Sequence, residues 1–341
     1  MKSPTEKYQE AIKLLDANRL EESAAIFMNL QKTPAIAPYC HYHLAGISNA
    51  AGDPETAYSL YYRAFKALPT IAKDMFPDTH SSHKYAYKGK NPEKERTDCP
   101  LCGGLGRPYW CYSLPEAVGY NFFINPIRMW MYCEGCHHLF ARHFPEKIFL
   151  HNTAQRRANP AFFNYYSGVL EAVRKYTTGM SLFEVGVGAS ECLLAAQEIG
   201  YETFGIDVIE RHVEDAKNLY GLNVETSDFN EYQSDRKWDV IIMGDVLEHV
   251  NDPVAAIQKA ESLLADEGSL WISTPNFESA FSAVAGHNDV MRKQQYHLNY
   301  FSRESLYNLL GRFKLAPVEY QISGHYNGSM EVIAVKEARI R

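Results

Sequence analysis

Apolar positions in the first fifth of the chain recur three or four residues apart. This spacing, between residues 5 and 69, is typical of four short amphipathic helices. From about residue 180 the pattern changes to short apolar runs of strand length that alternate with helical stretches. Strands separated by helices of this length need crossover connections, which predict an α/β fold with a mostly parallel, doubly wound sheet.

The helical region contains an internal repeat. A shift of 34 residues superposes small or apolar residues on one another: Ala11 on Ala45, Ser23 on Ala57, Phe27 on Tyr61 and Leu30 on Ala64. This period resembles the tetratricopeptide repeat, and the resemblance covers about two units within residues 1–77. Because about three units are normally needed for a free-standing array, we expect these helices to pack on the rest of the chain. The pattern leaves open whether they form a packing cap or a groove for a protein partner.

Two C-x-x-C pairs follow a polar stretch at residues 78–98, which is interpreted as a linker. The pairs are Cys99 with Cys102 and Cys133 with Cys136. Four thiolates from two such pairs suit tetrahedral zinc, so residues 99–148 are predicted to form a zinc ribbon. Four protein ligands leave no open coordination position, which predicts a structural zinc that does no chemistry.

The remaining cysteines and nearby histidines are weaker candidates for metal ligands. His137 and His138 directly follow the second pair and could replace one of its ligands. Cys40, Cys111 and Cys192 have no paired neighbour, and we expect them to be buried as small apolar residues.

A glycine turn follows the first strand of the predicted sheet, in the sequence LFEVGVGAS at residues 182–190. A dinucleotide site would have a third glycine, which is missing here, and the carboxylate of Glu184 would disfavour a pyrophosphate. A cofactor that carries positive charge fits better. S-adenosylmethionine, with its ammonium and sulfonium groups and no phosphate, is the expected cofactor.

The segments FEVGVGAS, FGIDV and WDVIIMGDVLEHVNDP resemble the motifs of the class I S-adenosylmethionine-dependent methyltransferases, in order and with ordinary spacing over residues 180–336. The resemblance implies a Rossmann-like seven-stranded sheet within residues 149–341. It also implies a set of cofactor-binding residues: Glu184, Gly186 and Gly188 on the methionine side, Asp207 for the ribose hydroxyls, Asp228 and Phe229 around the adenine, and Gly244 and Asp245 at the end of the fourth strand. Ser190 stands where the family usually has a third glycine, and its side chain limits how closely the backbone can approach the cofactor there.

The segments DVLEHV, STPN and HLNYFSRESLYNLLGRF are similar to those of small-molecule methyltransferases related to ubiquinone-biosynthesis O-methyltransferases and sugar methyltransferases. Some bacterial sugar C-methyltransferases also carry a zinc knot before the cofactor domain. This likeness favours a small-molecule acceptor, a sugar or polyol, with methyl transfer to oxygen or, less favoured, to carbon.

Catalytic residues are expected on a helix that starts at Asp245, where Asp245, Glu248 and His249 would share one face. His249 would act as the general base and Glu248 would orient its ring. Alternatively, the three would hold a divalent cation such as magnesium, as in some of the ubiquinone O-methyltransferases. The base is preferred because the sequence shows no fourth ligand. His297, after the fifth strand, is the second candidate base.

Acceptor recognition is expected from residues 149–168, which by resemblance fold over the pocket. Tyr165 and Tyr166 are candidate contacts there. The pair Arg156 and Arg157 could clamp a phosphate or carboxylate of an acceptor such as a nucleotide sugar.

Charge and composition argue against two classes of binding partner, nucleic acids and membranes. A formal net charge of −7 argues against nucleic acid, and no apolar run has the ~18 residues that a membrane span requires. The first residues lack the pattern of a secretory signal, so we expect a cytoplasmic protein. Two other functions stay open: a protein methyltransferase that recruits a polypeptide through the helical region, and a non-catalytic scaffold.

Overall fold

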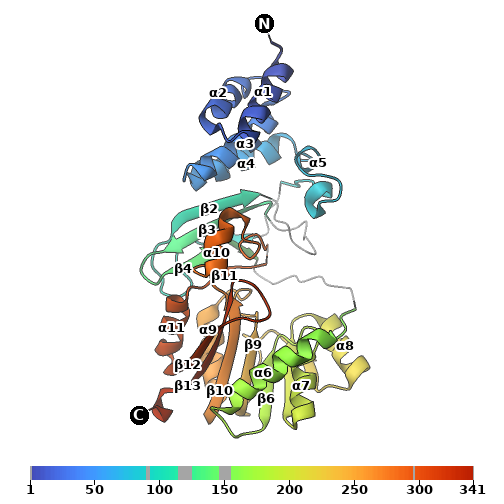
Figure 1. Ribbon diagram of the computed structural model, residues 1–341, viewed down its shortest axis with the longest axis vertical. Helices are drawn as coiled ribbons and strands as arrows, with labels where there is room; N and C mark the ends of the chain where they lie inside the picture. The colour runs from blue at the N-terminus through green and yellow to red at the C-terminus, as the bar shows by residue number, and fades with distance from the viewer. Residues whose placement is uncertain (1, 90–92, 114–124, 146–154, 295, 341) are drawn as a thin grey trace.

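The computed structural model describes residues 2–89, 93–113, 125–145, 155–294 and 296–340. Along its long axis the molecule has helices at the N-terminal end, a small antiparallel sheet in the middle, and a larger sheet with flanking helices at the other end (Figure 1). The expected boundary between residues 148 and 149 lies outside the described residues.

The four helices predicted near the N-terminus are present. They are α1 (Pro4–Asp16), α2 (Leu20–Leu30), α3 (Ala37–Ala50) and α4 (Pro54–Ala67), followed by the short α5 (Ala72–Met75). Ser3 and Glu6 form a capping box at the start of α1, and Asp53 caps α4 by accepting the Thr56 amide. These caps satisfy amide groups that would otherwise lack partners at the helix N-termini.

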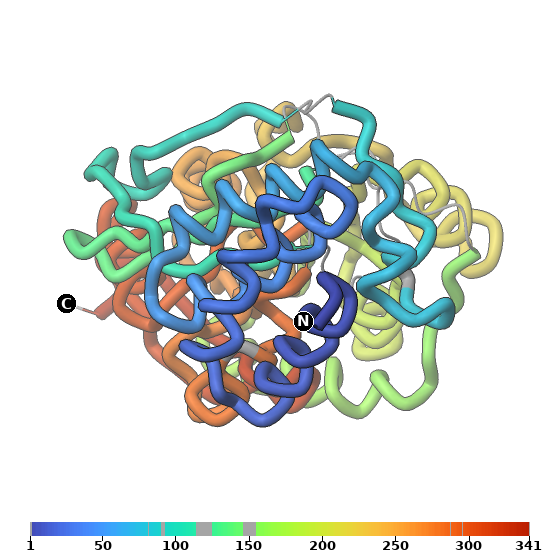
Figure 2. Tube along the Cα trace, turned by 90° about the horizontal axis from the view of Figure 1, so that it is seen from above, coloured from blue at the N-terminus to red at the C-terminus, as the bar shows by residue number. Residues whose placement is uncertain are grey.

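The helices pack on the middle sheet, as expected for an array of about two units. Tyr42 Oη lies 2.6 Å from Ser113 Oγ, and the Cys111 amide donates to Asn49 Oδ1 at 3.0 Å. Seen from above, the N-terminal helices lie over the rest of the chain (Figure 2). The resemblance to a tetratricopeptide repeat stays a prediction.

Residues 78–98 are more structured than a linker where the structure describes them. They contain a short 3-10 helix at Ser81–Lys84 and the strand β1 (Glu93–Glu95), which pairs with β5 (His143–Pro145). Tyr85 is fully buried in the core. The linker interpretation therefore needs correction, because this polar stretch contributes both a strand and a core side chain.

The middle sheet is completed by a strand from the far end of the chain. It comprises β2 (Arg107–Ser113), β3 (Ile127–Cys133), β4 (His138–Ala141) and β11 (Asn299–Tyr300), all antiparallel. In β11, Asn299 pairs with Phe140 and Tyr300 with Leu139. The cysteine-containing region and the C-terminal region therefore share one sheet.

The large sheet has the predicted seven strands, in the order β12-β13-β10-β9-β6-β7-β8. Only β13 runs antiparallel to its neighbours. The strands are β6 (Ser181–Val185), β7 (Glu202–Asp207), β8 (Val224–Thr226), β9 (Trp238–Gly244), β10 (Leu264–Pro275), β12 (Leu315–Ile322) and β13 (Ser329–Lys336). This arrangement confirms a Rossmann-like sheet.

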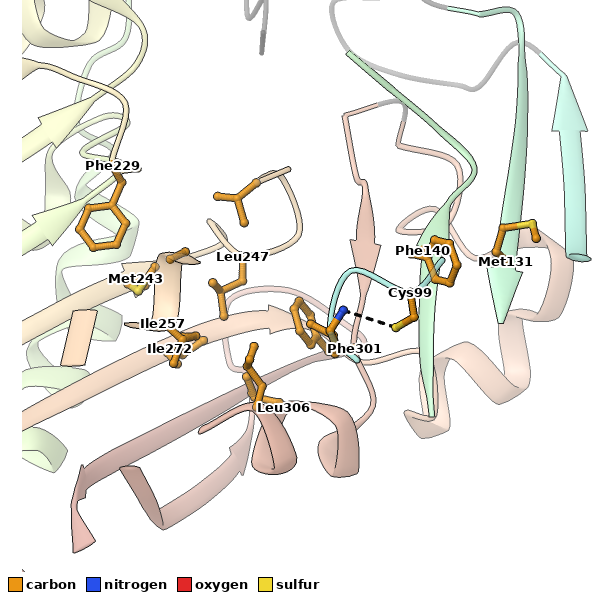
Figure 3. Packing of buried hydrophobic residues seen from close by; sticks show 14 of the residues in the cluster. Cys99, Met131, Phe140, Phe229, Met243, Leu247, Ile257, Ile272, Phe301 and Leu306 are labelled. Carbon is orange, nitrogen blue, oxygen red and sulfur yellow. Dashed lines mark hydrogen bonds between the residues drawn. The ribbon is translucent and has the colours of Figure 1, made fainter. Parts of the chain in front are cut away.

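Alternate residues of the central strands enter two different cores, one on each face of the sheet. Leu182 and Val240 pack with α6 (Phe163–Arg174), α7 (Glu191–Ile199) and α8 (Glu210–Tyr220). Phe183 and Ile241 pack with α9 (Pro253–Leu263) and α11 (Arg303–Arg312). The second core continues into the middle sheet, where Phe301, Phe140 and Cys99 lie close together (Figure 3).

Two further structural findings complete the fold. A short helix, α10 (Ala280–Ala285), lies between β10 and β11. Helix α9 ends at Leu263, and β10 begins at the next residue, Leu264, which pairs with Trp238. Across the described residues, no helix combines the length and apolarity needed to cross a membrane.

Candidate cofactor and catalytic site

The glycine turn after β6 is built from left-handed backbone conformations. Gly186 and Gly188 have φ values of +80° and +54°, and a Cβ at Gly186 would lie 2.9 Å from Val246 Cγ2. Ser190 has a φ of +77° and begins α7 without a side-chain cap. Ser190 thus takes the conformation that favours glycine, at a cost of roughly 1–2 kcal/mol. The turn keeps its shape although the third glycine is missing.

Glu184 is buried at the end of β6, directly before this turn. Burial, and then the charges of Glu191 and Asp207, raise the pKa of its carboxyl well above 4.5. Within the described part of the chain its Oε2 atom has no hydrogen-bond partner. An unpaired buried carboxylate oxygen suits a cationic ligand group such as the ammonium of S-adenosylmethionine.

Cofactor binding should therefore release a proton from Glu184. Below the raised pKa the free protein holds a proton there, and a bound cation favours the ionised form. Affinity should rise with pH until the pH passes this raised pKa, and then level off. Calorimetric titration in two buffers of different ionisation enthalpy measures the released proton. Glu184→Gln should abolish the release, and identical heats in both buffers with the unaltered protein would contradict the assignment.

Asp207, at the end of β7, is a buried acceptor for several groups. Its Oδ2 accepts the Gly188 amide at 2.9 Å and lies 3.2 Å from His212 Nδ1, and its Oδ1 accepts the Ile209 amide at 2.8 Å. A carboxylate has about four acceptor positions, so about one remains for a ribose hydroxyl. His212 lies on α8 and meets Asp207 only through the fold, so no local sequence pattern indicates this contact.

Asp207→Ala should weaken S-adenosylmethionine binding by about 1.5–3 kcal/mol, because a charged hydrogen-bond acceptor is lost. The substitution also frees the Gly188 amide, so part of the loss comes from the turn. Calorimetric titration measures the change, with Asp235→Ala, outside the predicted cofactor site, as a control. An unchanged dissociation constant would remove Asp207 from the cofactor site.

The structure places the two predicted adenine residues differently. Asp228 is exposed, and its Oδ1 accepts the Asn230 amide at 2.8 Å. Phe229 is buried against Phe183, with ring centroids 6.1 Å apart, so most of its ring surface is already covered. Their roles toward adenine stay predictions.

The helix expected to start at Asp245 is absent, which corrects the sequence-based prediction. Asp245 has a left-handed φ of +53°, residues 247–249 form a turn, and α9 begins only at Pro253 with Asp252 as its cap. Asp245 Oδ1 accepts Ser273 Oγ–H at 2.9 Å, and burial raises its pKa to about 6. Gly244 precedes it beside Trp271, whose ring would lie 3.3 Å from a Cβ at this position.

The structure brings Glu248, His249 and His297 together at the carboxyl ends of β9 and β10. One ligand-type atom from each lies within 4.8 Å of those of the other two, and the imidazole rings are 4.9 Å apart. Asp245 is not part of this group. All three predicted catalytic residues are therefore neighbours, although the helix meant to align them does not form.

Hydrogen bonds orient both imidazoles. His249 Nδ1 lies 3.0 Å from the Tyr296 carbonyl oxygen and His297 Nδ1 lies 2.8 Å from that of Met291. Because a carbonyl only accepts, each Nδ1 carries the proton and each Nε2 keeps its lone pair. Burial lowers the pKa of His249, and that of His297 well below 6.5, so both rings are neutral bases near neutral pH.

Glu248 is the buried carboxyl of the group. Burial, and then Asp245, raise its pKa well above 4.5, while Thr274 Oγ1 donates to its Oε2 at 3.0 Å. Two imidazole nitrogens and one carboxylate oxygen are also a ligand set for a divalent cation, and a backbone carbonyl behind each imidazole is the usual outer partner. The group therefore fits either a general base or a metal site.

The four cysteines of the two C-x-x-C pairs form a second cluster. Their Sγ atoms all lie within 4.8 Å of one another. The hydrogen bond from Cys136 and then the amides of Leu101 and Cys102 lower the pKa of Cys99 to about 6, against the effect of burial. A thiolate that receives backbone amides is what zinc coordination requires, so the cluster fits structural zinc.

The residue after each C-x-x-C pair takes a left-handed conformation. Gly103 has a φ of +73° and His137 one of +52°. His137 bonds to Tyr132 and His138 lies 3.4 Å from Asn299, and neither belongs to the cysteine cluster. As expected, Cys40, Cys111 and Cys192 are buried.

The candidate acceptor residues border an aromatic group at the edge of the site. His325 stacks on Phe162 with a centroid distance of 4.3 Å and on Tyr326 with 4.0 Å, and Tyr165 lies 5.1 Å from it. Tyr166 contacts Tyr165 at 5.0 Å. His325 and Tyr326, in the connection between β12 and β13, are not among the residues that the sequence predicts at the site.

The two candidate arginines differ in position. Arg156 Nη1 would lie 3.6 Å from a Cβ at Gly188, so this guanidinium reaches over the glycine turn. Arg157 is exposed and bonds to Gln155. Residues 149–154 of the expected covering segment lie outside the described residues.

Strand order, glycine turn and acidic strand ends together define a class I S-adenosylmethionine-dependent methyltransferase domain. Residues 153–320 match the sequence family described as "Methyltransferase domain", and this part of the chain belongs to that family.

The chain is also similar to curated and solved proteins. It is 30% identical to the ubiquinone biosynthesis O-methyltransferase of Haemophilus ducreyi over 129 residues, 35% of this chain and 53% of that one. It is 27% identical to the same-named enzyme of Cereibacter sphaeroides over 153 residues, 41% and 62% of the two chains. A solved S-adenosylmethionine-dependent methyltransferase from Clostridium acetobutylicum is 11% identical, covers 52% of this chain and 92% of its own, and has a TM-score of 0.43. The chain spans about half the length of the first curated relatives.

Proposed function

We propose that this protein transfers the methyl group of S-adenosylmethionine to a hydroxyl oxygen of a small molecule, and that the acceptor is a sugar or polyol. The observation that carries the proposal is the group of Glu248, His249 and His297 at the same sheet edge as the glycine turn. The names of the curated relatives support oxygen as the attacked atom, while transfer to carbon is less favoured.

His249 is the proposed general base. The hydroxyl oxygen attacks the methyl carbon in line, and the carbon–sulfur bond breaks. The electron pair of that bond stays on sulfur, so the product S-adenosylhomocysteine is a neutral thioether. The hydroxyl proton passes to the free Nε2 of His249, while the Tyr296 carbonyl keeps the ring in place through Nδ1. Glu248 stabilises the imidazolium that forms, and His297 is the second candidate base.

The same three residues could instead hold a divalent cation. In that case the Nε2 atoms of His249 and His297 and a Glu248 oxygen would be ligands, and the ion would lower the pKa of the acceptor hydroxyl. Activity that survives exhaustive chelation supports the base. Activity that returns only with added magnesium or another divalent ion supports the metal.

The proposed sugar site lies between the aromatic group and Arg156. Aromatic faces such as those of Tyr165 and Tyr326 pack against the apolar faces of sugar rings, while Arg156 over the glycine turn would bind a phosphate or carboxylate. A nucleotide sugar satisfies both features.

The experiment that tests the proposal is calorimetric titration of S-adenosylmethionine and S-adenosylhomocysteine, with zinc content measured on the same sample. Sugars, nucleotide sugars and phenols are then screened for the formation of S-adenosylhomocysteine. Micromolar binding followed by turnover of a small molecule supports the proposal. Absence of binding points to a scaffold, and methylation of proteins in cell extract without any small-molecule turnover points to a protein methyltransferase.

A further inference from the structure

We infer that the cysteine ribbon positions the catalytic histidines, and that Asn299 and Arg96 are the positioning residues through which it does so. The inference rests on the proposed function in so far as Glu248, His249 and His297 are catalytic. In structural terms, the middle sheet holds two segments of the site: the turn that carries Glu248 and His249, and the segment that carries His297.

Asn299 joins the middle sheet to the turn that carries Glu248 and His249. It is completely buried in β11, where it pairs with Phe140 of β4. Its Nδ2 donates to the carbonyls of Leu247 at 3.2 Å and Val250 at 2.7 Å, one on each side of the catalytic pair. One side chain thus fixes both ends of the short turn.

The backbone on either side of Asn299 adds to this contact. The amides of Leu298 and Asn299 both donate to the Glu248 carbonyl, at 2.6 and 3.1 Å. His297 directly precedes Leu298, so these bonds also set the distance between the two imidazoles. The relative placement of His249 and His297 therefore depends on where β11 lies.

Arg96 ties the same segments to the ribbon from another side. Its Nε donates to the Ala141 carbonyl at 3.1 Å, Nη1 to that of Asn251 at 3.1 Å and Nη2 to that of Leu298 at 3.2 Å. Ala141 ends β4, Asn251 follows the His249 turn, and Leu298 follows His297. The rigid guanidinium fork thus fixes three segments relative to one another.

Both anchors are close in sequence to the cysteine cluster. Arg96 shortly precedes Cys99, and the Asn299 carboxamide oxygen lies 3.4 Å from Nε2 of His138, which shortly follows Cys136. The cores are continuous as well, since Leu247, beside Glu248, packs in the same cluster as Phe301, Phe140 and Cys99 (Figure 3). If the cysteine cluster loses its ordered structure, these contacts loosen and the turn with Glu248 and His249 loses its fixed position.

A contact elsewhere in the same interface provides a matched control. Arg312, an exposed residue at the end of α11, donates from Nη1 to the carbonyl of Leu101 in the first cysteine loop. It joins ribbon and large domain as Arg96 does, but it bonds to neither catalytic segment. Removing it weakens the interface without releasing the histidines.

Hydrogen–deuterium exchange on the full chain tests the inference without any acceptor. In Asn299→Leu and in Arg96→Lys, the amides of His249, Leu298 and Asn299 or its replacement should exchange about tenfold faster or more, because their local opening becomes easier. Arg312→Met should leave these rates unchanged. The milder Arg96→Lys keeps the test valid if Asn299→Leu does not fold. Equal rates in all variants and the unaltered protein would overturn the inference.

Two further readouts separate this inference from the proposed function. Extraction of metal from the unaltered protein should speed exchange at the same amides, and unchanged rates would disconnect the ribbon from the catalytic turn. Once an acceptor that the protein methylates is known, Arg96→Lys should lower kcat about tenfold to a hundredfold and leave KM for S-adenosylmethionine unchanged. The reason is that misplaced catalytic histidines slow the methyl-transfer step. If no acceptor is turned over, the proposed function fails while the exchange result still decides the positioning role.

Discussion

Replacing His249 with glutamine should lower kcat for methyl transfer by about 10²- to 10⁴-fold, the contribution typical of a positioned general base. Glutamine can hydrogen-bond to the acceptor but cannot take its proton. The initial rate of S-adenosylhomocysteine formation measures kcat, while calorimetry should show unchanged cofactor affinity. His41→Gln, on α3, is the matched control and should leave the rate unaltered. A loss of less than threefold in His249→Gln would transfer the role of base to His297.

The rate of the unaltered protein should depend on pH in a direction set by the same residue. Because burial lowers the pKa of His249 from 6.5, its active neutral form persists below pH 6.5. The rate should therefore be flat from neutral pH down to that value and fall only as the pH drops through the lowered pKa. A kcat, measured at saturating cofactor, that is already halved above pH 6.5 would exclude His249 as the base.

Replacing both Cys99 and Cys133 with serine should release the zinc and destabilise the protein by several kcal/mol, up to the ~10 kcal/mol that a structural zinc site contributes. Each substitution removes a thiolate from a different C-x-x-C pair, which leaves two ligands. Metal analysis and denaturant unfolding followed by fluorescence measure the two effects. Cys40→Ser, a buried cysteine away from the cluster, should keep its zinc. One zinc per chain in the double variant would disprove the ribbon as a metal site.

The large sheet and its glycine turn were predictable because their signals are local. The patterns that predict each strand, each helix and the turn around Gly186 lie within a few consecutive residues. The acidic residues Glu184 and Asp207 are recognised because each lies at the end of a predicted strand. The cysteine cluster was predictable for the same reason, since each C-x-x-C pair sets its own geometry.

The arrangement at the catalytic group was only partly predictable. Glu248 and His249 are adjacent in sequence, but their approach to His297 is set by the Asn299 contacts and by the left-handed backbone at Asp245. An aspartate before an apolar run gives no sign that it will adopt a positive φ instead of starting a helix. Phe229 shows a different limit of sequence-based prediction. A single aromatic residue after a strand can pack in the core or contact a ligand, and the sequence alone does not distinguish these two roles.

The strand β11 has a consequence for the order in which this chain is assembled. Every residue of β4 is buried, and its pairing partner is Asn299–Tyr300, near the other end of the chain. During synthesis from the N-terminus, β4 emerges long before its partner and presents an unpaired, apolar sheet edge. A nascent chain that stops between these two strands carries an aggregation-prone edge, and completing it requires a contact of very high sequence separation, which is slow to form. The ribbon therefore depends on the domain that follows it for its final strand, and any scheme that divides the molecule between them cuts through a single sheet.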